Sequence, residues 1–148
     1  ASDLVFVSGG DVDAGMQLLE ARGMVSFLRE LFAAGKPFAG ISAGSIMLGR
    51  GWVRWPDPDD DSTATAFPCL GLAPLFCDTH AEAEEWEELK TVLAMSPEGT
   101  SGFGIPSGGA LRVDPDGTPA ALGLPVPRFV YRRGRVVGDG TVETDHRG

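Results

Sequence analysis

Two short apolar runs, each followed by a glycine-containing turn and then by a helix-forming stretch, constrain the fold of this chain most strongly. Residues 4–7 (Leu-Val-Phe-Val) lead into the turn 8–11 (Ser-Gly-Gly-Asp), and residues 38–41 (Phe-Ala-Gly-Ile) lead into residues 42–44 (Ser-Ala-Gly). Apolar runs of this length that end at Gly, Ser or Asp are typical of buried strands. Strand and helix therefore alternate twice, which predicts a parallel sheet with helices on its faces.

The helix expected between these strands covers residues 15–34, and its second half has the apolar spacing of an amphipathic helix. Asp11 or Asp13 can cap its start, Gly23 is expected to kink or split it, and Gly35 to end it. Two helical segments joined at Gly23 are therefore predicted.

The rest of the chain is less regular. Residues 50–68 are rich in Pro and Asp and are expected to form an exposed loop. An apolar segment at 70–76 ends at Cys77-Asp78-Thr79-His80, and residues 82–93 have helical periodicity. Short runs separated by turns then predict an antiparallel edge added to the parallel sheet, at 103–105, 110–113, 119–122, 129–131 and 136–137. A single α/β domain over residues 1–148 is predicted.

Composition excludes several classes of function. The formal net charge of −9 disfavours nucleic acids and anionic membrane surfaces as partners. No apolar stretch is long enough to span a bilayer and no signal peptide is visible, so a cytoplasmic protein is expected. Cys69 and Cys77 are the only cysteines and are expected to be free core residues, and no Cys/His cluster suggests a metal site.

The segment Gly40-Ile41-Ser42-Ala43-Gly44 matches the nucleophile elbow pattern G-x-S-x-G. In such an elbow a serine occupies a sharp strand-to-helix turn, and the two glycines leave room for close packing. The first amides of the helix then point to where an oxyanion would develop. The alternative interpretation is a small-residue turn that lets a helix pack closely on a strand.

A serine nucleophile needs a base, and the chain has two histidines. His146 lies in the polar C-terminal tail and is expected to be solvated, whereas His80 follows an apolar segment where open α/β sheets place their active sites. The alternative for His80 is a capping or loop histidine. The carboxylates between Ser42 and His80 are Asp57, Asp59, Asp60, Asp61 and Asp78, and spacing alone does not choose among them.

Two backbone amides could form an oxyanion hole. Ala43 follows the candidate nucleophile directly, and the Gly9-Gly10 turn would lie beside it in a parallel sheet. The alternative is that this Gly-Gly turn only serves the strand-to-helix geometry.

Four segments occur in an order that resembles the peptidase E (aspartyl dipeptidase) and cyanophycinase family, which are serine peptidases on a class I glutamine-amidotransferase-like fold. They are residues 7–11, the elbow at 40–44, residues 70–80 ending in Asp78-Thr79-His80, and Gly104-Ile105-Pro106. The resemblance covers essentially the whole chain. It implies a flavodoxin-like, three-layer architecture with a mostly parallel sheet, and a hydrolase that needs no metal or organic cofactor.

By position, the resemblance implies that Ser42 is the nucleophile, that His80 is its histidine, and that the amides of Gly10 and Ala43 form the oxyanion hole. The acid of peptidase E falls in the loop after the elbow helix, where Asp57 matches the spacing. Cyanophycinase-like members use a glutamate slightly later, near Asp60, which is the second candidate. Substrate contacts are expected from Gly9, Asp78 and Glu85.

The chain departs from the family pattern in three places. An arginine associated with acidic substrates is expected after the histidine, but residues 81–88 are acidic, so a neutral or basic substrate side chain fits better. The alternative is that these glutamates only form the acidic face of a helix. Family members begin with a further strand-helix-strand portion that this chain, which starts at Ala1, lacks. A cleaved precursor, or strands supplied by another chain, is therefore expected. The third departure, Ser45 in place of a small apolar residue, is expected to matter little.

The leading hypothesis is a serine exopeptidase that acts on small peptides as a dipeptidase and forms a homodimer. The same machinery could serve an esterase or amidase, and a non-catalytic partner subunit would be a different class of function. A glutamine amidotransferase fits less well, because those enzymes carry cysteine at the elbow.

Overall fold

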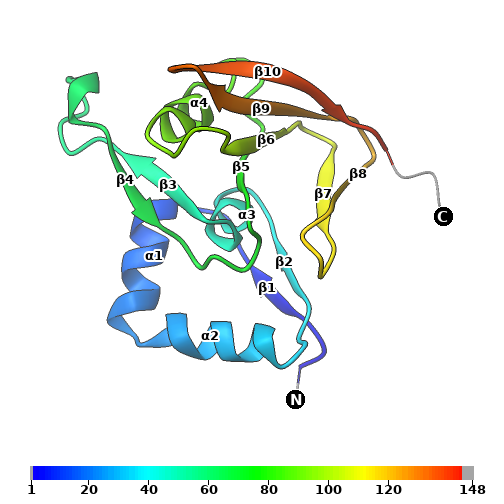
Figure 1. Ribbon diagram of the computed structural model, residues 1–148. Helices are drawn as coiled ribbons and strands as arrows, with labels where there is room; N and C mark the ends of the chain where they lie inside the picture. Colours follow the sequence, from blue (N-terminus) through cyan, green and yellow to red (C-terminus); the bar gives the residue numbers. More distant parts are fainter. Residues whose placement is uncertain (1, 145–148) are drawn as a thin grey trace. The chain divides into compact units, whose positions relative to one another are not determined.

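The computed structural model describes residues 2–144 and divides into two compact units, Ala1–Pro74 and Leu75–Gly148, which are described separately. Over the described residues the chain is a mixed α/β protein with four α-helices and several small sheets (Figure 1). The predicted α/β class is confirmed. Most strand pairs are antiparallel, and no parallel sheet dominates among the described strands.

The first unit begins with the predicted strand and split helix. Strand β1 (Val5–Val7) is followed by α1 (Val12–Ala21) and α2 (Met24–Ala33), and β2 (Phe38–Gly40) then pairs with β1 in parallel. Gly23 separates the helices in a left-handed conformation (φ 63°), which confirms the predicted break.

Residues 50–68 correct one sequence prediction. After α3 (Ala43–Leu48), β3 (Gly51–Arg54) and β4 (Thr65–Pro68) form an antiparallel hairpin, and the short 3₁₀ helix η1 (Asp61–Thr63) lies in its connection. An exposed loop over the whole segment was therefore the wrong prediction. The apolar residues that flank the Pro- and Asp-rich stretch supply the strands, because their side chains become buried: Trp52, Val53 and Phe67.

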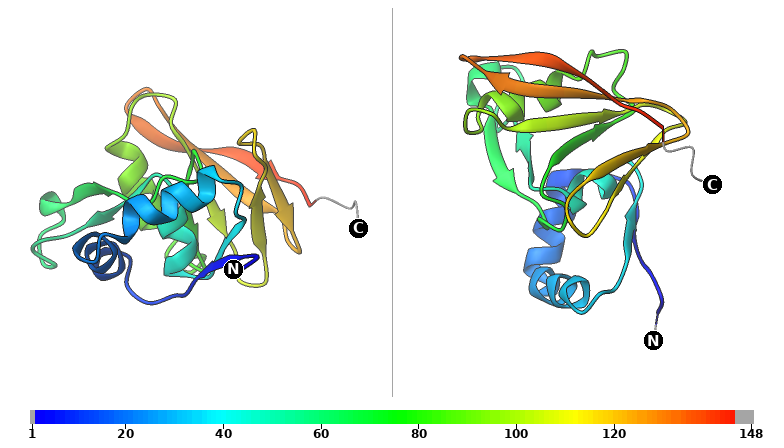
Figure 2. Two further views of the ribbon diagram at one scale, coloured as in Figure 1. Left: turned by 90° about the horizontal axis from the view of Figure 1, so that it is seen from below. Right: turned by 45° about the vertical axis from the view of Figure 1, so that its right-hand side comes forward.

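The second unit is built on a four-stranded sheet in the order β10-β9-β6-β5. Strands β5 (Phe76–Thr79) and β6 (Ser101–Ile105) are parallel, whereas β9 (Val126–Arg132) and β10 (Arg135–Val142) are antiparallel additions (Figure 2). The predicted antiparallel edge is therefore confirmed at 129–131 and 136–137, whereas residues 103–105 pair in parallel with β5, and residues 110–113 and 119–122 form a sheet of their own.

Helix α4 (Glu87–Ala94) packs on this sheet through three side chains that are almost fully buried: Leu89, Val92 and Leu93. A separate hairpin joins β7 (Ala110–Val113) to β8 (Pro119–Leu122) across the predicted Asp116-Gly117 turn.

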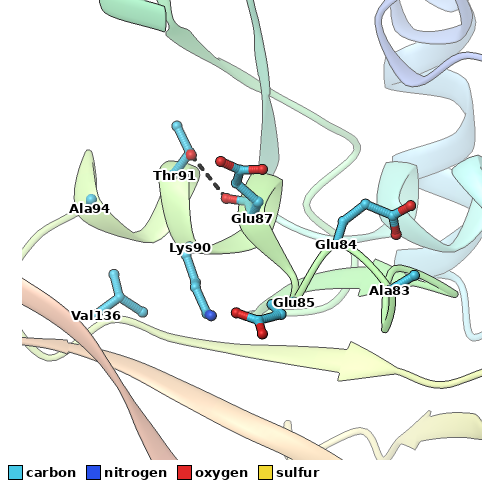
Figure 3. Close-up of a pocket in the computed structure, with 8 residues that line it drawn as sticks. All are labelled: Ala83, Glu84, Glu85, Glu87, Lys90, Thr91, Ala94 and Val136. Carbon is cyan, nitrogen blue, oxygen red and sulfur yellow. Dashed lines mark hydrogen bonds between the residues drawn. The ribbon is translucent and has the colours of Figure 1, made fainter.

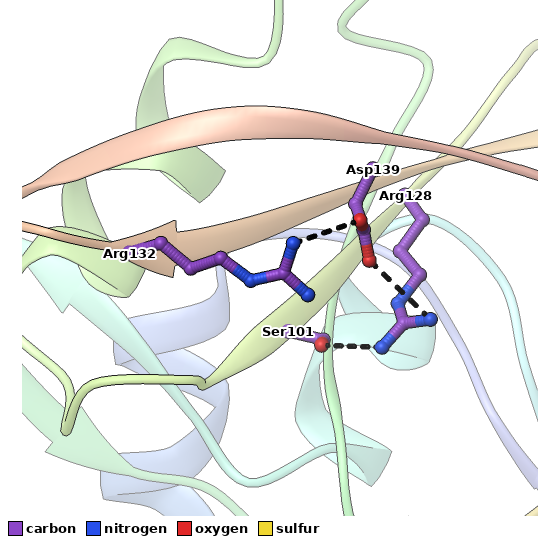
Figure 4. Close-up of polar contacts among 4 residues, drawn as sticks. All are labelled: Ser101, Arg128, Arg132 and Asp139. Atoms are coloured by element: carbon purple, nitrogen blue, oxygen red, sulfur yellow. Dashed lines mark hydrogen bonds and ion pairs between the residues drawn. The ribbon is translucent and has the colours of Figure 1, made fainter.

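A polar cluster on the sheet links β6, β9 and β10 (Figure 4). Asp139 pairs with Arg132 (3.3 Å) and with Arg128 (3.5 Å), and Arg128 Nη2 donates a hydrogen bond to Ser101 Oγ (3.0 Å). The two arginines are partly exposed, so we assign these pairs a stabilising effect of at most about 1 kcal/mol each.

Both cysteines are buried and neither is part of a disulfide, as predicted. Across residues 2–144, none of the helices combines the length and apolar character that crossing a membrane requires.

Candidate active site

Ser42 occupies the junction between β2 and α3 in a strained backbone conformation, with φ 53° and ψ −126°. Two hydrogen bonds close the turn around it, because Gly44 N–H donates to the Ile41 carbonyl and Ser45 N–H donates to the Ser42 carbonyl, both at 2.9 Å. A positive φ is unfavourable for serine by about 1–3 kcal/mol and is over-represented at functional sites. The predicted strand-turn-helix geometry is therefore present, with the strain centred on the serine.

The two glycines of the motif are required by packing. A Cβ atom at Gly40 would lie 2.6 Å from the Gly44 carbonyl carbon, and one at Gly44 would lie 2.1 Å from the Val7 carbonyl oxygen. Close packing of a helix on a strand thus accounts for both glycines. It does not account for serine at position 42, where glycine would adopt the observed backbone conformation with less strain.

The Gly9-Gly10 turn lies beside Ser42 because β1 and β2 run parallel. Val7 is the register partner of Gly40, and Ile41 N–H donates to the Val7 carbonyl (3.1 Å). A Cβ at Gly9 would be 3.2 Å from the Ser42 Cβ, whereas Gly10 (φ 139°) faces open space. The turn predicted to adjoin the elbow therefore adjoins it.

The two candidate acids, Asp57 and Asp60, lie at the tip of the β3–β4 hairpin, which projects away from α3 within the first unit (Figures 1 and 2). Both are exposed and hold the tip together. Asp57 Oδ1 accepts from Asp59 N–H (3.0 Å), and Asp60 Oδ1 accepts from the backbone and hydroxyl of Ser62 (2.9 and 2.6 Å). The Ser62 hydrogen bonds lower the pKa of Asp60.

His80 belongs to the second unit and follows β5 directly, at the carboxyl end of the strand as predicted. The backbone N–H of His80 donates to the Ile105 carbonyl (2.9 Å). The φ of His80 is 45°, and the residue is exposed. A left-handed residue ends the strand and turns the chain at this point. The other histidine, His146, lies outside the described residues.

Asp78 is the one carboxylate of the second unit's strands that is buried, with 5% of its surface exposed. Burial raises its pKa to about 6, and the Glu88 and Glu84 carboxylates act in the same direction. A hydrogen bond from Thr79 N–H to Oδ1 (2.8 Å) and the nearby His80 oppose this increase. Its predicted contact with substrate stays a prediction.

The segment between His80 and α4 is not helical, which corrects the helix predicted from residue 82. Glu85 (φ 52°) and Trp86 (φ 61°) are both left-handed, so α4 begins only at Glu87. Trp86 is buried, and its indole ring lies against Gly104 of β6. Trp86 has helical spacing relative to the α4 leucines, so the sequence pattern predicts a helix where the structure has a turn. The one sequence signal that a bulky group approaches β6 was the glycine at position 104 of that strand.

Glu85 lines an open hollow of about 680 Å³ along α4, and Val136 of β10 also lies in its lining (Figure 3). Its polar lining consists of three glutamates, one lysine and one threonine: Glu84, Glu85, Glu87, Lys90 and Thr91. The Lys90 ammonium also lies 5.4 Å from the centre of the Phe129 ring. Negative charge dominates this surface, so it would repel an acidic group and attract a basic one.

In the part of the chain that the structure describes, no three His, Cys, Asp or Glu side chains are grouped so that they could hold a metal ion.

Comparison with known families indicates the class of this protein. The model of peptidase family S51 matches residues 1–119. The chain belongs to peptidase family S51. The match confirms the resemblance to the peptidase E and cyanophycinase family, and membership indicates hydrolysis of the serine-peptidase type. Comparison with curated proteins found no match.

The matched range of this S51 peptidase contains the Gly9-Gly10 turn, the elbow, both hairpin-tip carboxylates and His80. The first three groups lie in the first unit and His80 in the second.

Proposed function

We propose that this S51 peptidase is a serine exopeptidase that cleaves small peptides, as a dipeptidase, through an acyl-enzyme. The observation that carries the proposal is the backbone of Ser42, which has a serine in a conformation that glycine would adopt with less strain. Membership of family S51 supports the same class of reaction.

In the proposed reaction, the Ser42 hydroxyl attacks the scissile carbonyl while the His80 imidazole accepts its proton. The amides of Gly10 and Ala43 stabilise the negative charge on the tetrahedral intermediate. His80 then gives the proton to the leaving amine, and the acyl-enzyme is hydrolysed by water with His80 again acting as base. A carboxylate, Asp57 as first candidate, orients the imidazole.

For the fold we propose the three-layer, class I glutamine-amidotransferase-like arrangement, with one mostly parallel sheet. The parallel pairs β1–β2 and β5–β6 support it, because in each pair a candidate site residue lies just beyond the carboxyl end of one strand. Ser42 follows β2 and His80 follows β5, and open α/β sheets bind ligands at the carboxyl ends of their strands.

The identity of the carboxylate that orients His80 is tested by replacing each of the two hairpin-tip aspartates in turn. Asp57→Asn is expected to lower kcat by about 10³-fold, because an amide does not stabilise the imidazolium that forms on His80. Asp60→Asn is the matched control, since asparagine can still accept the Ser62 hydrogen bonds, and its kcat should stay within about threefold of wild type. A large loss of kcat in Asp60→Asn but not in Asp57→Asn would assign the acid to Asp60. If both variants stay active, neither carboxylate of the hairpin tip is the acid.

Substrate preference is tested with a dipeptide panel in which the first residue is Asp, Ala or Lys. Glu84, Glu85 and Glu87 favour the lysyl and alanyl peptides over the aspartyl peptide, by about tenfold in kcat/KM. Glu85→Gln should reduce the preference for lysine, whereas Glu20→Gln, on α1, should not. N-acetylated dipeptides and p-nitrophenyl acetate in the same panel separate exopeptidase from endopeptidase and esterase activity. A wild-type preference for the aspartyl peptide would contradict the acidic-surface interpretation.

A further inference from the structure

We propose that Gly104 and Trp86 are positioning residues for His80: the indole ring seated on Gly104 holds the turn that follows the histidine. The inference rests on the proposed function of His80 as the base. It adds two residues to the site, neither of which touches the reacting groups.

The contact between Trp86 and Gly104 is too close for any other residue at position 104. A Cβ there would lie 2.5 Å from the indole Cδ2 and 2.6 Å from Cε2. The ring is buried, with 7% of the residue exposed. Glycine at position 104 of β6 is therefore required by the indole, whereas strand propensity would favour a larger residue.

The turn is attached to β6 at both of its ends. At the start, His80 N–H donates to the carbonyl of Ile105, and at the end Trp86 packs on Gly104, the preceding residue of the same strand. Between these points Trp86 N–H donates to the Ala81 carbonyl (3.1 Å), which closes the turn. A shift of the indole is therefore transmitted through one short loop to the histidine.

The backbone of this turn is unfavourable without the anchor. Glu85 and Trp86 are consecutive non-glycine residues with positive φ, a conformation that persists only where the surrounding structure enforces it. A further link joins the turn to the chain after β6, because Ser107 N–H donates to the Glu82 carboxylate. That link is exposed, so the buried indole is the firmer attachment.

The indole also lies on the same face of the sheet as the buried carboxylate next to the histidine. Gly104 is the register partner of Asp78 in the parallel pair β5–β6, and register partners present their side chains on the same face of a sheet. The Trp86 ring thus occupies the face on which Asp78 lies. Displacing the ring would alter both the turn and the surroundings of His80.

The test compares Gly104→Ala with Gly102→Ala. Gly102 is a matched control, because a Cβ there would also be crowded, at 2.8 Å from Leu89 Cδ1, but by α4 and not by the turn. Gly104→Ala is expected to lower kcat and the rate of fluorophosphonate labelling by about 10- to 100-fold with KM within about threefold. Gly102→Ala should keep kcat within about threefold.

A second measurement does not depend on activity. The chain has two histidines, so His146→Gln leaves one imidazole to observe by nuclear magnetic resonance. In that background, Gly104→Ala should shift the His80 ring resonances and Gly102→Ala should leave them in place. In the Gly104→Ala protein, Trp86→Phe should restore part of kcat, because the smaller ring leaves room for the new methyl group.

Equal effects of the two alanine variants on kcat and on the His80 resonances would overturn the inference. If Gly104→Ala does not fold, Trp86→Leu replaces it with the same expected results, since it removes the indole and keeps the glycine. A wild-type protein that neither hydrolyses peptides nor reacts with fluorophosphonate would overturn the proposed function, while the His80 resonances would still test the positioning.

Discussion

Ser42→Ala is expected to abolish hydrolysis and fluorophosphonate labelling, with a loss in kcat of at least about 10³-fold and up to about 10⁶-fold. Removal of the hydroxyl leaves only binding and the oxyanion amides to accelerate the reaction. The control is Ser45→Ala, three residues further along α3, which should retain both activities. Intact-mass measurement after labelling distinguishes a single modified serine from several.

Ser42→Gly separates function from strain at the same position. Glycine adopts φ 53° and ψ −126° more readily than serine. The free energy of unfolding of the variant should therefore be higher by about 1 kcal/mol, and the variant should remain inactive. Ser45→Gly, inside the helix, should lose a similar amount of stability. A stabilised but inactive Ser42→Gly would support a serine retained for chemistry. A destabilised Ser42→Gly would contradict the claim that the backbone of Ser42 is strained. An active Ser42→Ala would contradict the proposal that Ser42 is the nucleophile.

The fold was predictable from the sequence where local chemistry decides the structure. Gly23 splits the first helical segment because it takes a left-handed conformation, and the two strands before the glycine turns pair in parallel as expected. The β3–β4 hairpin was missed because its strands are four residues each and a Pro- and Asp-rich connection separates them. Long-range pairing, and not local propensity, stabilises such strands.

The candidate site was predictable to the same extent. Gly40 and Gly44 match a known pattern, and the structure contains it: Gly40 is required by the adjacent backbone of Gly44, and Gly44 by the close approach of Val7 on the neighbouring strand. The turn after His80 could not be predicted, because Trp86 fits the helical spacing of the α4 leucines and only its contact with Gly104 sets it apart. The sequence also could not show whether Asp57 or Asp60 orients the imidazole, because both lie in one short acidic run and both make local hydrogen bonds.

Asp78→Asn is expected to stabilise the protein at neutral and alkaline pH, by up to about 3 kcal/mol. The folded protein holds the Asp78 proton until about pH 6, whereas the unfolded chain releases it near the ordinary value of 3.8. Between these values the folded state binds more protons, so its stability falls as the pH rises and the full cost is present above pH 6. Asparagine resembles the protonated carboxyl, can still accept from Thr79 N–H, and carries no such cost.

Urea unfolding of the wild type and Asp78→Asn at pH of about 3 and about 8 measures this difference, which should be near zero in acid and largest in alkali. Asp116→Asn is a control with the opposite sign, because the Thr118 N–H bond lowers the pKa of Asp116, so its ionised form is favoured in the folded state. That variant should lose stability at the higher pH. Equal stability of Asp78→Asn and wild type at pH of about 8 would mean that burial does not penalise the ionised Asp78 carboxylate in the folded protein.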